Sequence, residues 1–279
     1  EILSQGTGEN LIEEFMLVAN QTVAQALGEY DYPTMYRVHD VPAPEVVNYF
    51  IELINKLGIK YQRREQLDLQ HEMQYLSSFV NSYGSKSGPF QYAFLRVLRK
   101  AYYSTDNIGH FGLAYKDYVH FTSPIRRYPD LMIHRIIKEN LKGKLDEERI
   151  DHYNEILPDI AGLSSKMERR AEEAEREVHK LKKAEYMLDH IGESYDGIIS
   201  GVTGWGIYVA LANTVEGMVR VEDMYDDDYE FEENRYRMTG RYSGKTYELG
   251  QRVRVVVVRA SVETRTVDFM FDEVIDYGS

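Results

Sequence analysis

The sequence contains no cysteine, and no apolar run approaches the roughly 18 residues that a membrane-spanning helix needs. Without cysteine the chain forms no disulfide bond, no thiolate metal site and no cysteine nucleophile. The first residues, Glu1 to Gly6, also lack the basic end and the apolar core of a signal peptide. We therefore expect a protein of the reducing cytoplasm, with no disulfides and no membrane partner.

Positive charge is also scarce, since 33 Lys and Arg face 46 Asp and Glu and give a formal net charge of −13. A basic surface is the usual signature of nucleic-acid-binding proteins, so the average charge argues against such a partner. The 43% of hydrophobic residues allows a folded core, and 279 residues fit about two domains. Because the chain starts at Glu1 without an initiator methionine and leads directly into a helical pattern, we expect a fragment of a longer protein.

The first two thirds of the chain have mainly helical periodicity, with apolar residues spaced three and four apart. The predicted helices span residues 11–27, 44–57, 66–83, 90–103 and 147–190. Glycines are expected to end the first, second and last of these helices, and Pro158 is expected to break the last one. A short extended segment is predicted at residues 35–38.

Beyond residue 191 the pattern changes to short β-rich runs separated by glycines. The predicted strands span residues 195–202, 206–211, 217–221, 252–260 and 264–271. About five short strands in such a segment are typical of a small closed barrel. We therefore divide the chain into residues 1–191 and 192–279, and we expect the run Asp226-Asp227-Asp228 to be a solvated loop, as blocks of like charge usually are.

The densest signal for chemistry lies in residues 120–135. Ser123 is expected to cap a helix that begins with a proline, because proline at the first helical position loses no hydrogen bond. Free backbone N–H groups at a helix start attract anions, and Arg126 adds a guanidinium group that matches phosphate oxygens. The alternative interpretation is that Arg126 or Arg127 pairs with Asp130 on one helix face.

Charge is unevenly distributed, because residues 91–138 hold eight Lys or Arg against three Asp and are therefore net +5. Six tyrosines are interleaved with these basic residues. Basic groups bind phosphates and flat aromatic rings stack on unpaired bases, so the composition favours single-stranded nucleic acid. Each tyrosine taken alone is still typical of a half-buried core residue.

Several segments follow one another in an order typical of one enzyme family. They are residues 11–20, 36–40, 103–104, 109–113, 120–135, 169–171 and 174–177. Together they resemble the RNB family of exoribonucleases, and residues 201–209 and 216–219 resemble the S-one-type RNA-binding barrel of those enzymes. The resemblance implies an α+β fold, in which a mainly helical portion of an RNB catalytic domain, residues 1–191, precedes a five-stranded antiparallel OB-fold barrel, residues 192–279.

The resemblance also implies an activity, which is processive hydrolysis of single-stranded RNA from its 3′ end to nucleoside 5′-monophosphates with Mg²⁺ as cofactor. Arg126 matches the arginine that holds phosphate near the scissile bond, and Glu13 and Glu175 match acidic positions that line the catalytic cavity. Further residues of the basic segment and the barrel are expected to bind RNA. They are His120, Arg127, Tyr128, Arg135, Trp205, Tyr208 and Arg220.

The chain departs from the family pattern at its start, because the aspartate cluster that binds metal in these enzymes lies upstream of residue 11. We therefore expect no metal ligand in this chain and no activity of the fragment alone. We also expect that a missing N-terminal part of the same protein packs on residues 1–191.

Two other functions stay open. One is an RNA-binding module without catalysis. The other is an HD-type metal phosphohydrolase, in which His39 and Asp40 bind a metal together with histidines from other helices. The candidates are His71, His110, His134 and His179, and none of them stands in a second His-Asp pair. A structural role of His39 and Asp40 is therefore the expectation.

Overall fold

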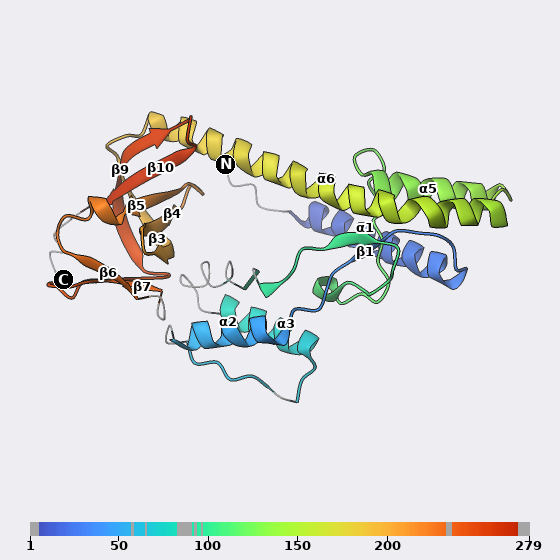
Figure 1. Ribbon diagram of the computed structural model, residues 1–279, viewed down its shortest axis with the longest axis horizontal. Helices are drawn as coiled ribbons and strands as arrows, with labels where there is room; N and C mark the ends of the chain where they lie inside the picture. Colours follow the sequence, from blue (N-terminus) through green and yellow to red (C-terminus); the bar gives the residue numbers. More distant parts are fainter. Residues whose placement is uncertain are drawn as a thin grey trace. The chain divides into compact units, whose positions relative to one another are not determined.

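The computed structural model describes residues 6–56, 59–64, 66–82, 91, 94–95, 97–232 and 236–272. The chain divides into two compact units, which Figure 1 shows by their helices and strands. The first unit comprises Glu1–Pro42 and Leu98–Glu172, and the second comprises Ala43–Val97 and Glu173–Ser279. The boundary that the sequence predicts at residue 191 falls between helix α6 (Glu147–Leu188) and strand β3 (Ser194–Thr203), and it stays a prediction.

The first unit is built around two helices and a small sheet. Its elements are α1 (Thr7–Glu29), β1 (Tyr36–Val38), β2 (Tyr102–Ser104), the 3-10 helix η2 (Phe111–Leu113), α5 (Tyr128–Leu141) and the first part of α6. Strand β1 pairs with β2 in antiparallel register. The predicted helix over residues 90–103 lies partly outside the described residues. Its predicted C-terminal end is wrong, because Tyr102 and Tyr103 belong to strand β2. Tyr103 lies in a strand because its N–H donates to Ser165 Oγ at 2.9 Å and its backbone pairs with Arg37.

Helix α6 continues without a break through Pro158, in contrast to the prediction. Proline removes one backbone N–H and crowds the preceding turn, which normally breaks or kinks a helix. Here the neighbouring side chains of Leu157 and Ala161 are buried in the core of the first unit, together with Met132 and Ile136 of α5. Packing of this apolar stripe offsets the cost of the proline.

Helix α5 begins at Tyr128, so the predicted helix start at Ser123 and the proline after it is wrong. Residues 124–126 form a turn instead. The N–H groups of Arg126 and Arg127 both donate to the carbonyl oxygen of Ser123, at 3.3 and 3.0 Å. Arg127 stands at the N-cap position, and the second proline of the motif occupies the first turn of the helix.

The second unit contains α2 (Pro44–Lys56), α3 (Leu69–Asn81), the last part of α6 and a closed barrel. The barrel strands are β3, β4 (Gly206–Leu211), β5 (Glu216–Arg220), β9 (Arg252–Ser261) and β10 (Thr266–Phe271), in the order β10-β5-β4-β3-β9. All five were predicted to within a few residues. The fully antiparallel arrangement was not correct, because β10 pairs with β5 in parallel. An odd number of strands cannot alternate direction all the way round a closed ring.

The barrel core is apolar, with Ile199, Val209, Val257 and Phe269 fully buried. Gly217 on β5 is required by this packing, because a Cβ atom there would lie 2.5 Å from the Phe269 ring. The strands therefore present alternate side chains outward, and those outward residues form the surface that is available to a ligand.

An inserted three-stranded sheet follows the 3-10 helix η3 (Val221–Asp223) and was not predicted. Its strands are β6 (Tyr229–Glu232), β7 (Arg237–Gly240) and β8 (Thr246–Glu248). The aspartate run before it lies in a turn outside the strands, and Asp226 and Asp228 are exposed, as predicted for a solvated loop. Asp227 accepts hydrogen bonds from the Ser243 hydroxyl and from the N–H groups of Ser243 and Tyr242, and these bonds lower its pKa to about 2. Asp226 and Asp228 pair with Lys245 and Arg241.

Among the described residues, no helix is long and apolar enough to cross a membrane.

Candidate nucleic-acid interface

A buried carboxylate organises the turn that precedes α5. Asp130 has no exposed surface, and its Oδ2 accepts hydrogen bonds from Arg127 Nε at 3.1 Å and Arg127 Nη2 at 2.7 Å. The N–H of Ser123 donates to the same oxygen at 2.8 Å. The pairing alternative from the sequence therefore holds for Arg127, whereas Arg126 is left out of the pair.

Arg126 is exposed on the turn and has no ion-pair partner in the described part of the chain. Its neighbour Ile125 is fully exposed, and Tyr128 is half exposed. Arg135 lies one to two turns further along α5, with its guanidinium 5.8 Å from the centroid of the Tyr128 ring. Neither Arg126 nor Arg135 has an ion-pair partner in the described part of the chain, so the turn and α5 present two unneutralised cations beside apolar and aromatic side chains.

His120 is a neutral ring rather than a cation. Its Nδ1 is 2.8 Å from the hydroxyl of Tyr103, and the ring makes edge contacts with Tyr103 and Tyr118. Burial, reinforced by nearby arginines, lowers the pKa of His120 to about 2. His120 can therefore offer hydrogen bonds or ring contacts to a ligand, but no charge.

Arg37 on β1 is a basic residue of this region that the sequence analysis did not single out. It pairs with Glu168 of α6 at 2.5 Å and lies over the Tyr103 ring at 4.7 Å. In the sequence, Arg37 stands out only as part of the segment 36–40 that resembles the RNB family. The prediction from that segment concerned His39 and Asp40 instead.

His39 and Asp40 make structural contacts. The N–H of Gly112 donates to His39 Nδ1 at 2.8 Å, and His39 Nε2 donates to the carbonyl oxygen of Arg99 at 2.5 Å. Asp40 pairs with Arg99 at 3.4 Å and accepts a hydrogen bond from Tyr102 at 3.2 Å. Because both ring nitrogens of His39 bind backbone groups, this arrangement favours the structural role over a metal-binding one.

The two predicted acidic residues lie in different units. Glu13 is exposed on α1, and Glu175 is exposed on α6 with its carboxylate 3.8 Å from His179 Nε2. Within the described ranges no group of three or more His, Cys, Asp or Glu is placed to hold a metal ion. The described residues therefore do not fit a magnesium site by themselves.

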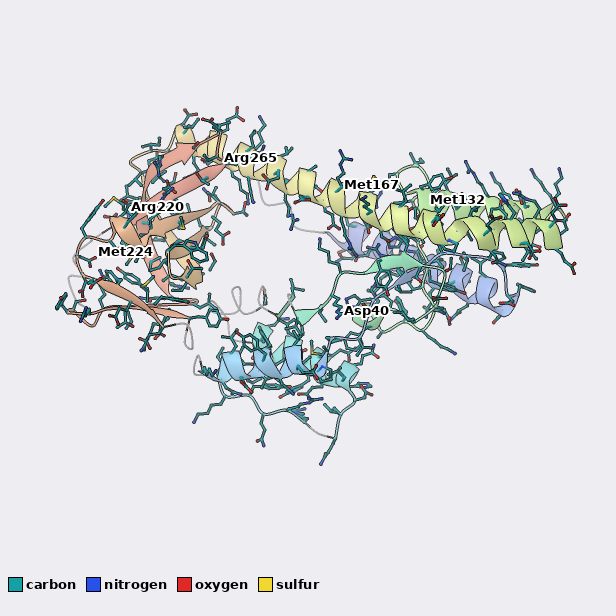
Figure 2. All side chains as sticks on the ribbon, in the orientation of Figure 1. Asp40, Met132, Met167, Arg220, Met224 and Arg265 are labelled. Carbon is teal, nitrogen blue, oxygen red and sulfur yellow. The ribbon has the colours of Figure 1, made fainter. Side chains whose placement is uncertain are left out.

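Aromatic side chains project from the barrel where β3 turns into β4. Trp205 is 64% exposed, and its Nε1–H donates to the hydroxyl of Tyr208 at 3.2 Å. Arg220, labelled in Figure 2, lies at the end of β5 opposite Gly206, directly after Trp205. Its guanidinium is 3.3 Å from the carboxylate of Asp268. The three predicted barrel residues are thus neighbours along β4 and β5.

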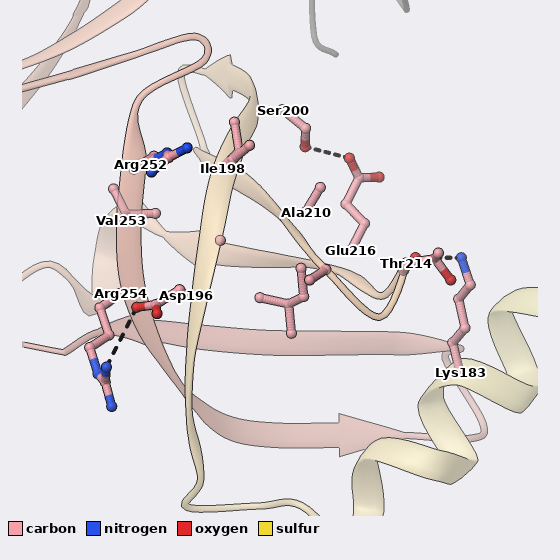
Figure 3. A pocket seen from close by; sticks show the side chains of 13 residues that line it. Lys183, Asp196, Ile198, Ser200, Ala210, Thr214, Glu216, Arg252, Val253 and Arg254 are labelled. Carbon is pink, nitrogen blue, oxygen red and sulfur yellow. Dashed lines mark hydrogen bonds and ion pairs between the residues drawn. The ribbon is translucent and has the colours of Figure 1, made fainter. Parts of the chain in front are cut away.

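A groove of about 870 Å³ runs along the outer face of the barrel, shown in Figure 3. Most of its charged side chains are paired: Arg254 is 3.5 Å from Asp196, and Ser200 Oγ donates to Glu216 at 2.5 Å. Arg252 has no partner within the described residues. Ser200 and Glu216 also line a second cavity of about 610 Å³ that includes Tyr208, so the outer face is hollowed from Tyr208 toward Arg252.

Two domain families match the chain. Residues 1–143 match the RNB domain, and residues 188–270 match the S1 RNA binding domain. Ribonuclease R 1 of Lactococcus lactis is 38% identical over 270 residues, which cover 96% of this chain and 33% of that protein. Ribonuclease R of Aquifex aeolicus is 40% identical over 261 residues, covering 93% and 36%. The chain thus spans about a third of the length of these relatives.

A solved structure is similar over both parts of the chain. It is RNase R of Mycoplasma genitalium in complex with ribose methylated single-stranded RNA, which matches with a TM-score of 0.87 at 28% identity. The match covers 97% of this chain and 42% of that one.

Proposed function

Because this chain belongs to the RNB family and is similar to the C-terminal portion of ribonuclease R, we propose that it is part of a processive 3′-to-5′ exoribonuclease. The proposed reaction is hydrolysis of single-stranded RNA to nucleoside 5′-monophosphates. One observation carries the proposal for the site: the exposed cation of Arg126 stands on a turn that a buried carboxylate holds in place. We include a cytoplasmic location in the proposal, because a chain without cysteine suits a reducing compartment.

Arg126 is proposed to contact the phosphate near the scissile bond. Its guanidinium has no ion-pair partner among the residues that the structure describes, and Asp130 fixes the backbone from which it projects. A donor held in advance at the place where negative charge develops stabilises a transition state more than it stabilises bound substrate. Tyr128 and Arg135 are proposed to bind the adjoining nucleotide. Arg127, whose charge Asp130 neutralises, is proposed to contribute hydrogen-bond donors, and His120 a neutral ring contact.

The barrel is proposed to bind the same strand without taking part in the reaction. Trp205 and Tyr208 offer flat faces for base stacking, and Arg220 offers a cation for a phosphate. Because residues 192–279 carry nine Lys or Arg against seventeen Asp or Glu, bulk charge cannot bind RNA there. Binding has to come from this one local face.

Mg²⁺ is proposed as the cofactor of the longer enzyme only, since the described residues do not form its site. Glu13 and Glu175 are proposed to lie near the product or metal environment of that enzyme without being sufficient ligands.

Helix α1 supplies an argument for a further part of the same protein. Four large apolar side chains on it are more than half exposed, namely Leu11, Ile12, Phe15 and Val18. An apolar face of this kind is typical of a contact surface. We propose that the rest of the catalytic domain covers it.

The test of the function uses an uncapped single-stranded RNA labelled along its backbone. The longer protein with Mg²⁺ should release nucleoside 5′-monophosphates progressively from the 3′ end, and a blocked 3′ end should stop the reaction. Internal cuts, or the same rate on blocked RNA, would refute the exoribonuclease.

The alternative, an RNA-binding module without catalysis, is favoured by the lack of clustered metal ligands in the described residues. It predicts that both this chain and the longer protein bind the labelled RNA without shortening it. If this chain alone shortens the RNA, the metal ligands must lie within it, contrary to our proposal.

A further inference from the structure

Two arginines of the barrel share one buried carboxylate. Asp268 on β10 is 3% exposed, and its Oδ2 accepts from Arg259 Nε at 2.7 Å and Nη2 at 2.5 Å. Arg220 Nη2 approaches the same oxygen from β5 at 3.3 Å. The strand register explains the arrangement, because Asp268 lies opposite Arg259 on one side and opposite Met218 on the other, two residues before Arg220.

Asp268 is the carboxylate that both guanidinium groups share, and the second carboxylate near them, Glu222, is exposed and lies 3.4 Å from Arg220 Nη1. Most other described cations of the barrel domain pair with carboxylates of their own: Arg237, Arg241, Lys245, Arg254 and Arg265. In a domain of nine basic and seventeen acidic residues, two guanidinium groups on one carboxylate are therefore exceptional.

Both guanidinium groups keep donors for a ligand. Arg259 is 60% exposed at its side chain, although two of its nitrogens bind Asp268. Arg220 is 34% exposed at its side chain and contacts Asp268 and the exposed Glu222 only at 3.3 to 3.5 Å, near the limit of a hydrogen bond, so its terminal nitrogens keep donors although its Nε is buried. An arginine carries five N–H donors, so neither group is saturated.

The cluster lies beside the exposed tryptophan. Arg220 is opposite Gly206 in the β4–β5 register, and the N–H of Val221 donates to the carbonyl oxygen of Trp205 at 3.1 Å. Single-stranded RNA presents bases and phosphates in alternation, so a stacking surface next to a cationic pair fits one nucleotide and its phosphate.

We propose that Arg220 and Arg259 together form a subsite for one phosphate of single-stranded RNA, and that Asp268 is the positioning residue that holds them. The inference rests on the proposed RNA binding by the barrel and adds Arg259 and Asp268 to it. Arginine suits this task because its planar fork matches two phosphate oxygens at once.

Replacement of the carboxylate distinguishes positioning from simple charge. Asp268→Asn removes one negative charge, so it should strengthen RNA binding if the arginines act only through bulk charge. If Asp268 orients the two forks, the same variant weakens binding although the protein has become more positive. The sign of the change therefore decides between the two.

The experiment measures binding of a fluorescently labelled oligouridylate to this 279-residue chain by anisotropy, over a series of salt concentrations. Arg259→Gln should weaken binding about tenfold, the loss of one charge-assisted contact, and lower the salt slope by about 0.7. The matched control is Arg241→Gln, because Arg241 is also 60% exposed and lies in the inserted sheet. It should change affinity less than about threefold, as an exposed charge away from the strand.

Three further variants complete the test. Arg259→Lys should also weaken binding, since it keeps the charge but loses the fork, and it decides the question if Asp268→Asn unfolds the barrel. Arg220→Gln with Arg259→Gln should lower the salt slope no more than either single variant, because both contact one phosphate. Equal effects of Arg259→Gln and Arg241→Gln, or tighter binding by a folded Asp268→Asn, would overturn the subsite. If the unaltered chain binds no RNA, the proposed function fails as well.

Discussion

The basic turn of the first unit and the cationic edge of the barrel both contain a buried aspartate that binds arginine, but the two aspartates bind different numbers of arginines. In the first unit the buried Asp130 neutralises Arg127 and leaves Arg126 free on the turn. In the barrel the buried Asp268 is shared between Arg259 and Arg220. In both regions a carboxylate that is itself inaccessible fixes the geometry of an arginine, and an exposed guanidinium group lies within reach of a ligand. The net charge of −13 does not reveal either region.

The largest expected effect is a loss of stability when Asp130, the buried carboxylate of the first unit, is replaced. Asp130→Asn leaves the nearly buried Arg127 without a counter-charge, which should reduce the free energy of unfolding by about 3–5 kcal/mol. Urea denaturation of this chain measures the change. The control is Asp228→Asn, which removes an exposed partner of Arg241 and should have a much smaller effect. If both variants lower the free energy of unfolding by the same small amount, Asp130 does not stabilise the turn through its pair with Arg127.

Arg126 itself should matter for turnover rather than stability. In the longer enzyme, Arg126→Ala is expected to lower turnover at saturating RNA about 10²- to 10³-fold, the usual loss for one preorganised donor to developing charge. RNA affinity should change far less. Arg135→Ala, on the neighbouring helix, is the control and should mainly raise the RNA concentration needed for half-maximal rate. Unchanged turnover of the Arg126 variant would remove it from the reaction.

The two units should also respond differently to acid. The pKa of His120 is lowered to about 2, from an unfolded value near 6.5, so the unfolded state binds more protons and the first unit loses stability as pH falls below about 6.5. At pH 5 this amounts to at most about 2 kcal/mol. In the second unit the pKa of Asp227 is lowered to about 2, so its stabilisation is lost only as pH falls below about 4.

The sole tryptophan makes this difference measurable. Trp205 fluorescence reports unfolding of the barrel, whereas far-UV circular dichroism reports mainly the helices. Between pH 7 and pH 5 the urea midpoint should fall by circular dichroism and stay nearly constant by fluorescence. His120→Gln should reduce the pH dependence of the helical transition. If both urea midpoints fall together between pH 7 and pH 5, and His120→Gln leaves these shifts unchanged, then His120 is not the cause of the pH dependence.

The smallest effect on RNA binding is expected for Arg252, an arginine that no buried carboxylate holds in place. Arg252 lies in the groove of Figure 3 and has no partner within the described residues, and no buried carboxylate orients it. Arg252→Gln should weaken RNA binding less than about threefold, through general charge alone. If Arg252→Gln weakens binding as much as Arg259→Gln in the same anisotropy assay, then positioning by a buried carboxylate does not determine how much an arginine contributes to RNA binding.

Much of the fold follows from local sequence patterns. Apolar periodicity placed α1, α2 and α3, and glycine-bounded β-rich runs placed the barrel strands, because each of these elements buries a single face. The presence of one parallel pair could also have been predicted, since five strands cannot alternate around a ring, whereas its identity as β5 and β10 comes from the structure.

The remaining differences depend on tertiary contacts that a local pattern does not contain. Ser123 and the following proline look like a helix start, but the buried Asp130 draws the Ser123 N–H into a turn. Pro158 looks like a break, but the packing of Leu157 holds α6 together. The importance of Asp268 is likewise invisible in the sequence, because its two arginines come from strands nine and 48 residues away.

We propose that two separate surfaces of this chain, the turn before α5 and the Trp205 edge of the barrel, bind one single strand of RNA. Photocrosslinking of this chain to an RNA that contains 4-thiouridine, followed by mass spectrometry of the peptides, tests it most directly. We predict crosslinks concentrated in residues 120–135 and 203–208, with the inserted sheet nearly free of them. Crosslinks spread evenly over the chain, or confined to the inserted sheet, would contradict the account.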